Sequence, residues 1–169
     1  MMFPVVVIFL AVILAGGVMW VGQAYRMLSF ARIQRDEAWV ELRTALQECR
    51  DMIPYIVAAV PANISPALDV LGNACDLAAN VEGVRECSQA ESRLKAAISR
   101  LFEQLDTDAT IETLDMLLPL RERLKDQAMR VEVLKETYNR MASVYNSLLK
   151  KGAARILVSL GMARPVELF

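Results

Sequence analysis

Acidic side chains are the groups in this sequence best suited to acid–base or metal chemistry, but they lack the partners that such chemistry needs. The chain has 20 Asp and Glu residues and no His, which is the commonest general base and metal ligand. A di-metal site in a helical bundle would also need Glu-x-x-His pairs. The carboxylates alternate with Arg and Lys, as on solvent-exposed helix faces; examples are Asp36, Glu37, Glu41, Asp51, Glu132 and Glu136. We therefore expect a non-enzymatic protein with no catalytic residue, cofactor, metal or small-molecule substrate.

The cysteines and the overall charge argue against two further kinds of site. Cys49, Cys75 and Cys87 are widely spaced, whereas zinc sites use closely spaced ligand pairs. Each cysteine lies on an apolar stripe with helical spacing, which favours buried free thiols in a reducing compartment. The formal net charge of −1 leaves no basic patch of the kind that nucleic acids require. We expect no nucleic-acid partner.

The N-terminal segment predicts a membrane anchor. The first 25 residues contain no charged side chain, and residues 4–22 are long enough to cross a bilayer as one helix. A cleaved signal peptide is the alternative, because Gly22-Gln23-Ala24 resembles a cleavage site, although no Lys or Arg precedes the apolar run. Basic residues just after the segment predict a cytoplasmic location for the rest of the chain; they are Arg26, Arg32 and Arg35. We expect a single-pass protein of the inner, cytoplasmic membrane with its N-terminus outside.

Beyond residue 25 the apolar residues recur at steps of three and four, which predicts helices rather than strands. The first seam consists of Trp39, Leu42, Leu46, Cys49, Ile53, Ile56 and Val60. A shorter second helix is expected after an N-cap at Ser65-Pro66, and a third from a capping box at Ser88–Glu91 to a turn at 106–110. The last and longest helix is stopped by Gly152. The sequence thus predicts an all-α protein with an N-terminal transmembrane helix followed by an antiparallel four-helix bundle with long first and last helices.

Three regions follow from this pattern: a transmembrane anchor at 1–25, a helical bundle at 26–150, and an apolar and basic tail at 151–169. Pro54 and Pro119 fall inside predicted helices and should kink them. An even number of helices returns the chain to the membrane end. The tail, with basic residues from Lys150 to Arg164, is therefore expected either at an anionic membrane surface or as a cap over the end of the bundle.

The second predicted helix is too short to cover the whole length of the first and last helices. If the middle hairpin packs on their distal half, residues 26–40 and 135–150 form a two-helix stem with a partly uncovered apolar face. A second copy of the chain or another membrane protein would then bury this face. We expect self-association, association with another membrane protein, or both.

Polar and aromatic residues in this stem form a candidate interaction surface. Tyr138 and Tyr145 lie one heptad apart, so they share a helix face with Asn139 and Asn146 beside them. An antiparallel first helix would bring its own polar residues opposite this face. The full candidate set is Arg32, Arg35, Trp39, Tyr138, Asn139, Tyr145 and Asn146. These residues either fix helix register and partner choice, or are core aromatics whose polar tips reach water.

Several of these residues also resemble a known family. Tyr25-Arg-Met-Leu28, Ala38-Trp39 and Asp51-Met-Ile-Pro54 are similar to the first helix of the LemA family, without a gap. Tyr138-Asn139 and Tyr145-Asn146 resemble the paired Tyr-Asn motif of its last helix, and Gly161-Met162 with Phe169 resembles its Gly-Phe tail. The sequence departs from the family pattern at Arg26, Glu48, Cys49, Tyr55 and Lys135.

The resemblance implies an antiparallel helical bundle with a short N-terminus outside and the bundle inside. It also implies two functions. The first is a membrane-tethered scaffold or adaptor, since the family is discussed alongside envelope quality control and membrane proteases. The second is a membrane-organising or vesicle-shaping role of the magnetosome-associated LemA-like type. We expect the scaffold role, and binding of the tail to anionic liposomes would favour the second.

Overall fold

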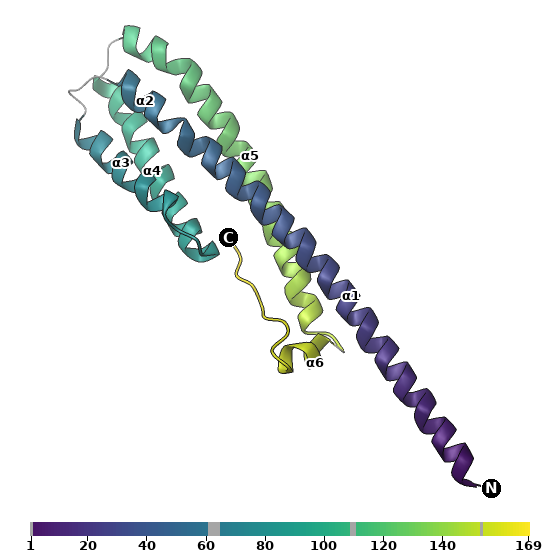
Figure 1. Cartoon of the computed structure of the whole chain (residues 1–169). Helices are drawn as coiled ribbons and strands as arrows, with labels where there is room; N and C mark the ends of the chain where they lie inside the picture. Colours follow the sequence, from purple (N-terminus) through teal and green to yellow (C-terminus); the bar gives the residue numbers. More distant parts are fainter. Residues whose placement is uncertain (1, 61–64, 109–110, 153) are drawn as a thin grey trace. The chain divides into compact units, whose positions relative to one another are not determined.

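All secondary structure in the described part of the chain is helical. The computed structural model describes residues 2–60, 65–108, 111–152 and 154–169, with side chains for 8–60, 67–107, 115–152 and 154–169. The helices, in chain order, are α1 (Met2–Asp51), α2 (Ile53–Ala59), α3 (Ser65–Ala79), α4 (Val84–Asp108), α5 (Ile111–Leu149) and α6 (Ala154–Ser159) (Figure 1). No strand occurs in these ranges, and the predicted all-α fold is confirmed.

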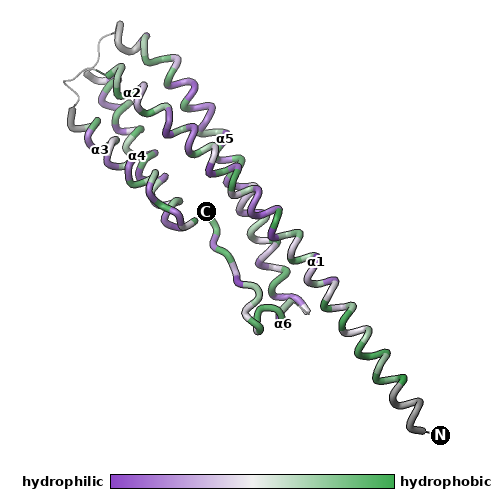
Figure 2. The backbone as a smooth tube through the Cα atoms, in the orientation of Figure 1, coloured by the Kyte–Doolittle hydropathy of each residue, from purple (hydrophilic) through white to green (hydrophobic). Residues whose placement is uncertain are grey.

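The apolar N-terminal segment and the first predicted bundle helix form one continuous helix, α1, of 50 residues. Its N-terminal part contains a window of 18 residues that is long and apolar enough to cross a membrane, and none of this window is buried (Figure 2). A helix satisfies its own backbone hydrogen bonds, which is what a bilayer requires of a spanning segment. The structure therefore agrees with the predicted membrane-spanning helix.

The two prolines have different structural consequences. α1 ends at Asp51 and α2 begins at Ile53, with Pro54 in the first two positions of α2. There the missing N–H of proline leaves no hydrogen bond unmade, so Pro54 marks a boundary between two helices rather than a bend within one. Pro119 lies inside α5, which continues through it.

The helix boundaries further along differ in part from those predicted. The predicted cap at Ser88 is wrong, because α4 begins at Val84 and the Cys87 amide already donates to the Gly83 carbonyl at 2.8 Å. Glu86 in the first turn favours this earlier start through the helix dipole. The predicted cap at Ser65 and the centre of the turn at 106–110 lie outside the described side chains and residues.

The chain divides into two compact units. Unit 1 comprises Met1–Ala38 and Arg140–Val166, and unit 2 comprises Trp39–Asn139 and Glu167–Phe169. α1 and α5 each contribute to both units.

Unit 2 contains an antiparallel arrangement of helices around an apolar core. Glu48 of α1 accepts a hydrogen bond from Arg130 of α5 at 2.6 Å, and Trp39 of α1 contacts Tyr138 of α5, so the two helices run in opposite directions. The core joins residues of α2 and its C-cap Val60 with residues of α3, α4 and α5: Ile53, Ile56, Val60, Leu71, Ala78, Ala90, Leu94, Ala97, Leu101, Leu105, Leu117 and Leu124. Helical periodicity puts these apolar residues on one face of each helix.

Unit 1 has a smaller core made by α1, α5 and the segment after α5. Its buried residues are Leu28, Ala31, Tyr145, Leu149, Leu157 and Ala163. α5 ends at Leu149, followed by Gly152 in the left-handed conformation with φ of +42°, as the predicted stop requires. A second left-handed glycine, Gly161 with φ of +74°, follows α6. Leu157 and Ala163 of the tail therefore pack against α1 and α5 within this unit.

Candidate functional site

Three aromatic rings meet in unit 2. Trp39 of α1 and Tyr138 of α5 have ring centroids 5.2 Å apart with planes tilted by 48°, and the Phe169 ring lies 6.0 Å from Trp39. Tyr138 is 2% exposed, and its hydroxyl donates a hydrogen bond to the main-chain carbonyl of Glu167 at 2.9 Å. Burial of a tyrosine hydroxyl requires such a partner. The tail is therefore part of this cluster.

Asn139 binds the main chain of the tail through both ends of its amide. Its Nδ2 donates to the carbonyl oxygen of Phe169 at 3.2 Å, and its Oδ1 accepts from the Phe169 amide at 2.8 Å. Both bonds involve main-chain atoms, so the contact recognises an extended segment without depending on the side chain at that position. We call this arrangement the Asn139 clamp.

Unit 1 contains a second clamp of the same kind. Asn146 donates to the Val166 carbonyl at 2.8 Å and accepts from the Val166 amide at 2.9 Å. The preceding residue, Tyr145, is buried, and the Arg35 guanidinium lies over its ring, 4.8 Å from the centroid. The two asparagines thus hold the tail in the same way, but their neighbouring tyrosines have different aromatic or cationic contacts.

The two arginines of the candidate set differ in their surroundings. Arg35 has a side chain that is 12% exposed, contacts Tyr145 and forms an ion pair with Asp36. Arg32 has a side chain that is 66% exposed and reaches Asp36 only at 3.8 Å. The structure thus places Trp39, Tyr138 and Asn139 together in unit 2 and Arg35, Tyr145 and Asn146 together in unit 1, and leaves Arg32 on the surface.

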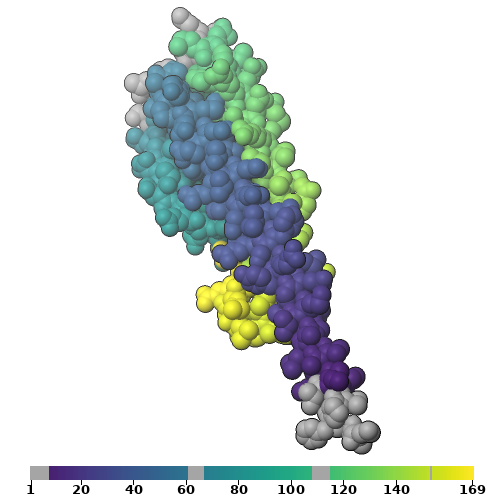
Figure 3. Space-filling view, turned by 45° about the vertical axis from the view of Figure 1, so that its right-hand side comes forward, coloured from purple at the N-terminus to yellow at the C-terminus, as the bar shows by residue number. Residues whose placement is uncertain are grey.

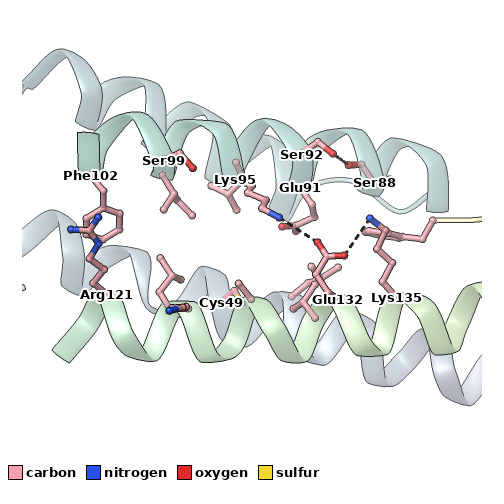
Figure 4. Close-up of a pocket in the computed structure, with 18 of the residues that line it drawn as sticks. Cys49, Ser88, Glu91, Ser92, Lys95, Ser99, Phe102, Arg121, Glu132 and Lys135 are labelled. Carbon is pink, nitrogen blue, oxygen red and sulfur yellow. Dashed lines mark hydrogen bonds and ion pairs between the residues drawn. The ribbon is translucent and has the colours of Figure 1, made fainter. Parts of the chain in front are cut away.

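A cavity of about 490 Å³ lies between α4 and α5 in unit 2 (Figure 4). Its lining is mainly apolar, and Phe169 of the tail forms part of it. The apolar lining residues include Leu46, Leu94, Ile98, Phe102, Leu124, Ala128 and Val131. The tail held by the Asn139 clamp therefore leads to an open apolar space, which we call the α4–α5 groove.

Ion pairs cross the groove or line its edge. Glu132 of α5 accepts from Lys95 of α4 at 3.3 Å and lies 3.7 Å from Lys135 (Figure 4). At the other end, the Arg121 guanidinium lies 5.1 Å from the Phe102 ring centroid. These side chains are largely exposed, and exposed ion pairs contribute little to stability.

One ion pair beside the groove is much less exposed. Arg50 of α1 donates to Glu91 of α4, and their side chains are 10% and 12% exposed. Burial raises the pKa of Glu91, and the charge and hydrogen bond of Arg50 oppose that rise. The Arg50 Nε has no hydrogen-bond partner within the described residues. The pair fixes α1 against α4 at a cost in desolvation.

The thiols near this pair are poor nucleophiles. Burial, followed by the charges of Glu91 and Glu48, raises the pKa of Cys49 to about 11. Burial also raises the pKa of Cys75 and of Cys87. The thiolate is the reactive form of cysteine, so these groups stay protonated and inert near neutral pH.

Sequence periodicity does not identify the tail residues that the clamps bind. Val166 and Glu167 were not candidates, and Phe169 was noted only as part of a resemblance. The one available signal was the repeated Tyr-Asn pair, because a buried Asn needs partners for both its donor and its acceptor.

Comparison with known proteins identifies the family. A search of curated proteins gives no match to the chain. A family model described as the LemA family matches residues 38–169, which include all of unit 2 and the part of unit 1 from α5 onward. Because this match covers most of the chain, and because it includes both Tyr-Asn pairs and the tail that they hold, the protein belongs to the LemA family.

Proposed function

We propose that this protein is a single-pass membrane protein that acts as a non-enzymatic scaffold or adaptor, and that it binds other proteins through the α4–α5 groove of unit 2. α1 serves as the anchor, and the basic residues that follow it orient the helical region toward the cytoplasm, with the N-terminus outside. The membrane is the inner, cytoplasmic one.

The observation that supports the scaffold role is the way in which unit 2 already binds a chain segment. Asn139 holds Phe169 by its main chain, and Trp39 and Tyr138 provide aromatic surface beside it. Main-chain hydrogen bonds that give affinity, combined with apolar pockets that give specificity, are a recurring mode of peptide recognition. The groove next to Phe169 offers such an apolar pocket.

Self-association is part of this proposal. Three large apolar side chains of α1 in unit 1 are more than half exposed: Met27 at 62%, Phe30 at 63% and Ile33 at 55%. Contiguous exposed apolar surface favours a partner, and a second copy offers the same surface. Light scattering of the detergent-solubilised protein should give an oligomer at micromolar concentration, and a monomer there would contradict self-association.

Filling the groove tests the scaffold role. Ala128 lines the groove and is exposed, so Ala128→Trp should fill it without disturbing the core. Ala96→Trp is the matched control, because Ala96 is exposed on α4 but does not line the groove. A photo-reactive amino acid at Lys125, which lines the groove, should crosslink a defined neighbour in native membranes.

The expected result is that Ala128→Trp abolishes this crosslink and Ala96→Trp preserves it, with equal melting temperatures for both variants. A crosslink that is the same in both variants would contradict binding in the groove. A photo-reactive group at Arg123, which is exposed on α5 and does not line the groove, should give no such crosslink.

A membrane-organising or vesicle-shaping role is the second candidate. It is supported by exposed apolar and basic residues around α6 in unit 1, including Leu160 at 66% exposure and Arg155. If purified protein deforms anionic vesicles and captures no defined neighbour through the groove, this role replaces the scaffold.

A further inference from the structure

The segment around α6 has two apolar faces. On one face, Leu157 and Ala163 are buried against Leu28 and Leu149 of the unit 1 core. On the other face, three large apolar side chains remain exposed: Ile156 at 45%, Leu160 at 66% and Met162 at 67%. In the space-filling view, part of the surface of this C-terminal segment, coloured yellow, is open to solvent (Figure 3). The packing of α6 onto unit 1 therefore leaves some of its apolar side chains exposed.

The charge of this segment has one sign. Residues 140–166 contain no Asp or Glu, and their basic residues are Arg140, Lys150, Lys151, Arg155 and Arg164. All five of these side chains are exposed. Exposed apolar side chains among exposed cations are typical of segments that lie in the interface of an anionic membrane.

A contact with α1 places this surface near the end of the apolar segment. A Cβ atom added to Gly152 would lie 3.0 Å from the Trp20 ring, so the turn between α5 and α6 packs directly against Trp20. Trp20 belongs to the last turns of the uncharged segment at residues 1–25. Tryptophan is enriched at the boundary between the bilayer and water. The turn and α6 therefore lie at the depth of the lipid headgroups when α1 spans the bilayer.

We propose that α6 and the turns before and after it, residues 150–164, form a binding surface for anionic phospholipid headgroups. Ile156, Leu160 and Met162 enter the boundary between headgroups and acyl chains, and the basic residues contact lipid phosphates. This proposal uses the membrane-spanning role of α1 from the proposed function, but it does not depend on the scaffold role. Each basic residue near an anionic surface contributes about fivefold to the affinity.

The depth of α6 can be measured in the full chain. The protein, with Cys49, Cys75 and Cys87 changed to Ala, is reconstituted into vesicles of phosphatidylcholine alone or mixed with phosphatidylglycerol. A nitroxide on Leu160→Cys reports its relative accessibility to oxygen and to a water-soluble nickel chelate. Ser143→Cys is the matched control, because Ser143 is exposed on α5 and lies about 9 Å of helix rise before Leu149, the last residue of α5.

We expect the label at position 160 to favour oxygen over the nickel chelate several-fold, and more so with phosphatidylglycerol. The label at position 143 should favour the nickel chelate in both membranes. A label at position 160 that is equally open to the nickel chelate in both membranes would overturn the proposal.

A charge variant tests the role of the basic residues. Lys150→Gln, Lys151→Gln and Arg155→Gln together should remove the dependence on phosphatidylglycerol. The control with equal charge removed is Arg93→Gln, Arg100→Gln and Arg123→Gln, whose residues are exposed in unit 2, and it should retain the dependence. An unchanged dependence in the first variant would refute the headgroup contacts. Extraction of the protein by alkaline carbonate would instead refute the anchor, and the proposal with it.

Discussion

The two units use the same Tyr-Asn motif in different surroundings. In each, an Asn on α5 binds both main-chain groups of one tail residue, Phe169 in unit 2 and Val166 in unit 1. Aromatic rings and a groove with charges of both signs lie around the first clamp. The second clamp belongs to a unit in which all charged residues of segment 140–166 are basic. The motif itself therefore fixes the tail, and the surroundings determine what each unit can bind.

Among the predicted effects, a cavity in the core should give the largest loss in the free energy of unfolding, and this loss should differ between the two units. Leu105→Ala in unit 2 removes a side chain that is fully buried and should lower the free energy of unfolding by about 3 kcal/mol. Leu157→Ala in unit 1 should cost about 1.5 kcal/mol, because its smaller cluster lies nearer to solvent and can collapse. Chemical denaturation measures both values.

The part of the protein that each substitution destabilises should differ as well. Leu157→Ala should expose the segment after α5 to proteolysis while the circular dichroism of unit 2 persists, whereas Leu105→Ala should lower the melting temperature of the helical signal. Equal costs in both units would contradict the comparison of their cores.

The Arg50–Glu91 pair gives unit 2 a dependence on pH. Arg50→Met leaves the Glu91 carboxylate poorly solvated and without its cation, so it should lower the free energy of unfolding by about 2 kcal/mol at neutral pH. Burial raises the pKa of Glu91 above its ordinary value of 4.5. The stability linked to its proton is therefore complete below about pH 4.5 and is lost as the pH rises through the raised pKa in the folded state.

The cost of Arg50→Met should accordingly shrink as the pH falls through the raised pKa of Glu91, because protonation removes the charge of the buried carboxylate. Adding Glu91→Gln should restore most of the stability at neutral pH, because no buried carboxylate then remains. Urea titrations at several pH values measure both effects, and a cost that does not change with pH would refute this role of Glu91.

Much of the fold follows from the helical period of the apolar residues. Leu94, Leu101 and Leu105 recur at helical spacing within the third predicted helix and are all buried in the unit 2 core. The start of their helix was misplaced because Ser88–Glu91 matches a capping box, although the stripe extends back to Cys87. Glu91, the presumed cap residue, instead pairs with Arg50. A local motif was outweighed by a tertiary contact that the sequence does not reveal.

Only the α5 side of the candidate site could be predicted from the sequence. The heptad spacing of Tyr138 and Tyr145 identified the face of α5, because side-chain periodicity is visible in a sequence. Its partners in the tail were not predictable, because Asn139 and Asn146 bind main-chain atoms that every residue has. The helical period also predicts Arg32 and Arg35 on one surface. Arg32 lies almost one helical turn before Arg35 in α1, and only Arg35 lies over the Tyr145 ring.

Each clamp can be opened separately. Asn139→Ala should lose two hydrogen bonds to Phe169 and destabilise the attachment of the tail by about 1 to 2 kcal/mol. Hydrogen exchange at the Phe169 amide should then be about tenfold faster or more. Asn146→Ala should have the corresponding effect on Val166.

The aspartate variants separate the two halves of each clamp. Asn139→Asp keeps the acceptor for the Phe169 amide and loses the donor to the Phe169 carbonyl. Hydrogen exchange at the Phe169 amide should therefore be faster than in the wild type and slower than in Asn139→Ala. Exchange at Phe169 that is unchanged in Asn139→Ala would show that the rings of Trp39 and Tyr138 hold the tail without the amide.

Removing the tyrosine hydroxyls should give the smallest difference in stability between the two units. Tyr138→Phe removes the donor to the Glu167 carbonyl and leaves a buried acceptor, so it should cost about 1 kcal/mol. Tyr145→Phe should cost close to nothing, because its ring keeps the contact with Arg35 and its hydroxyl makes no hydrogen bond within the described residues. Denaturation midpoints of the two variants measure the difference. A larger cost for Tyr145→Phe would mean that its hydroxyl has a partner outside unit 1, in the membrane or in another copy, and would make that hydroxyl part of an interface.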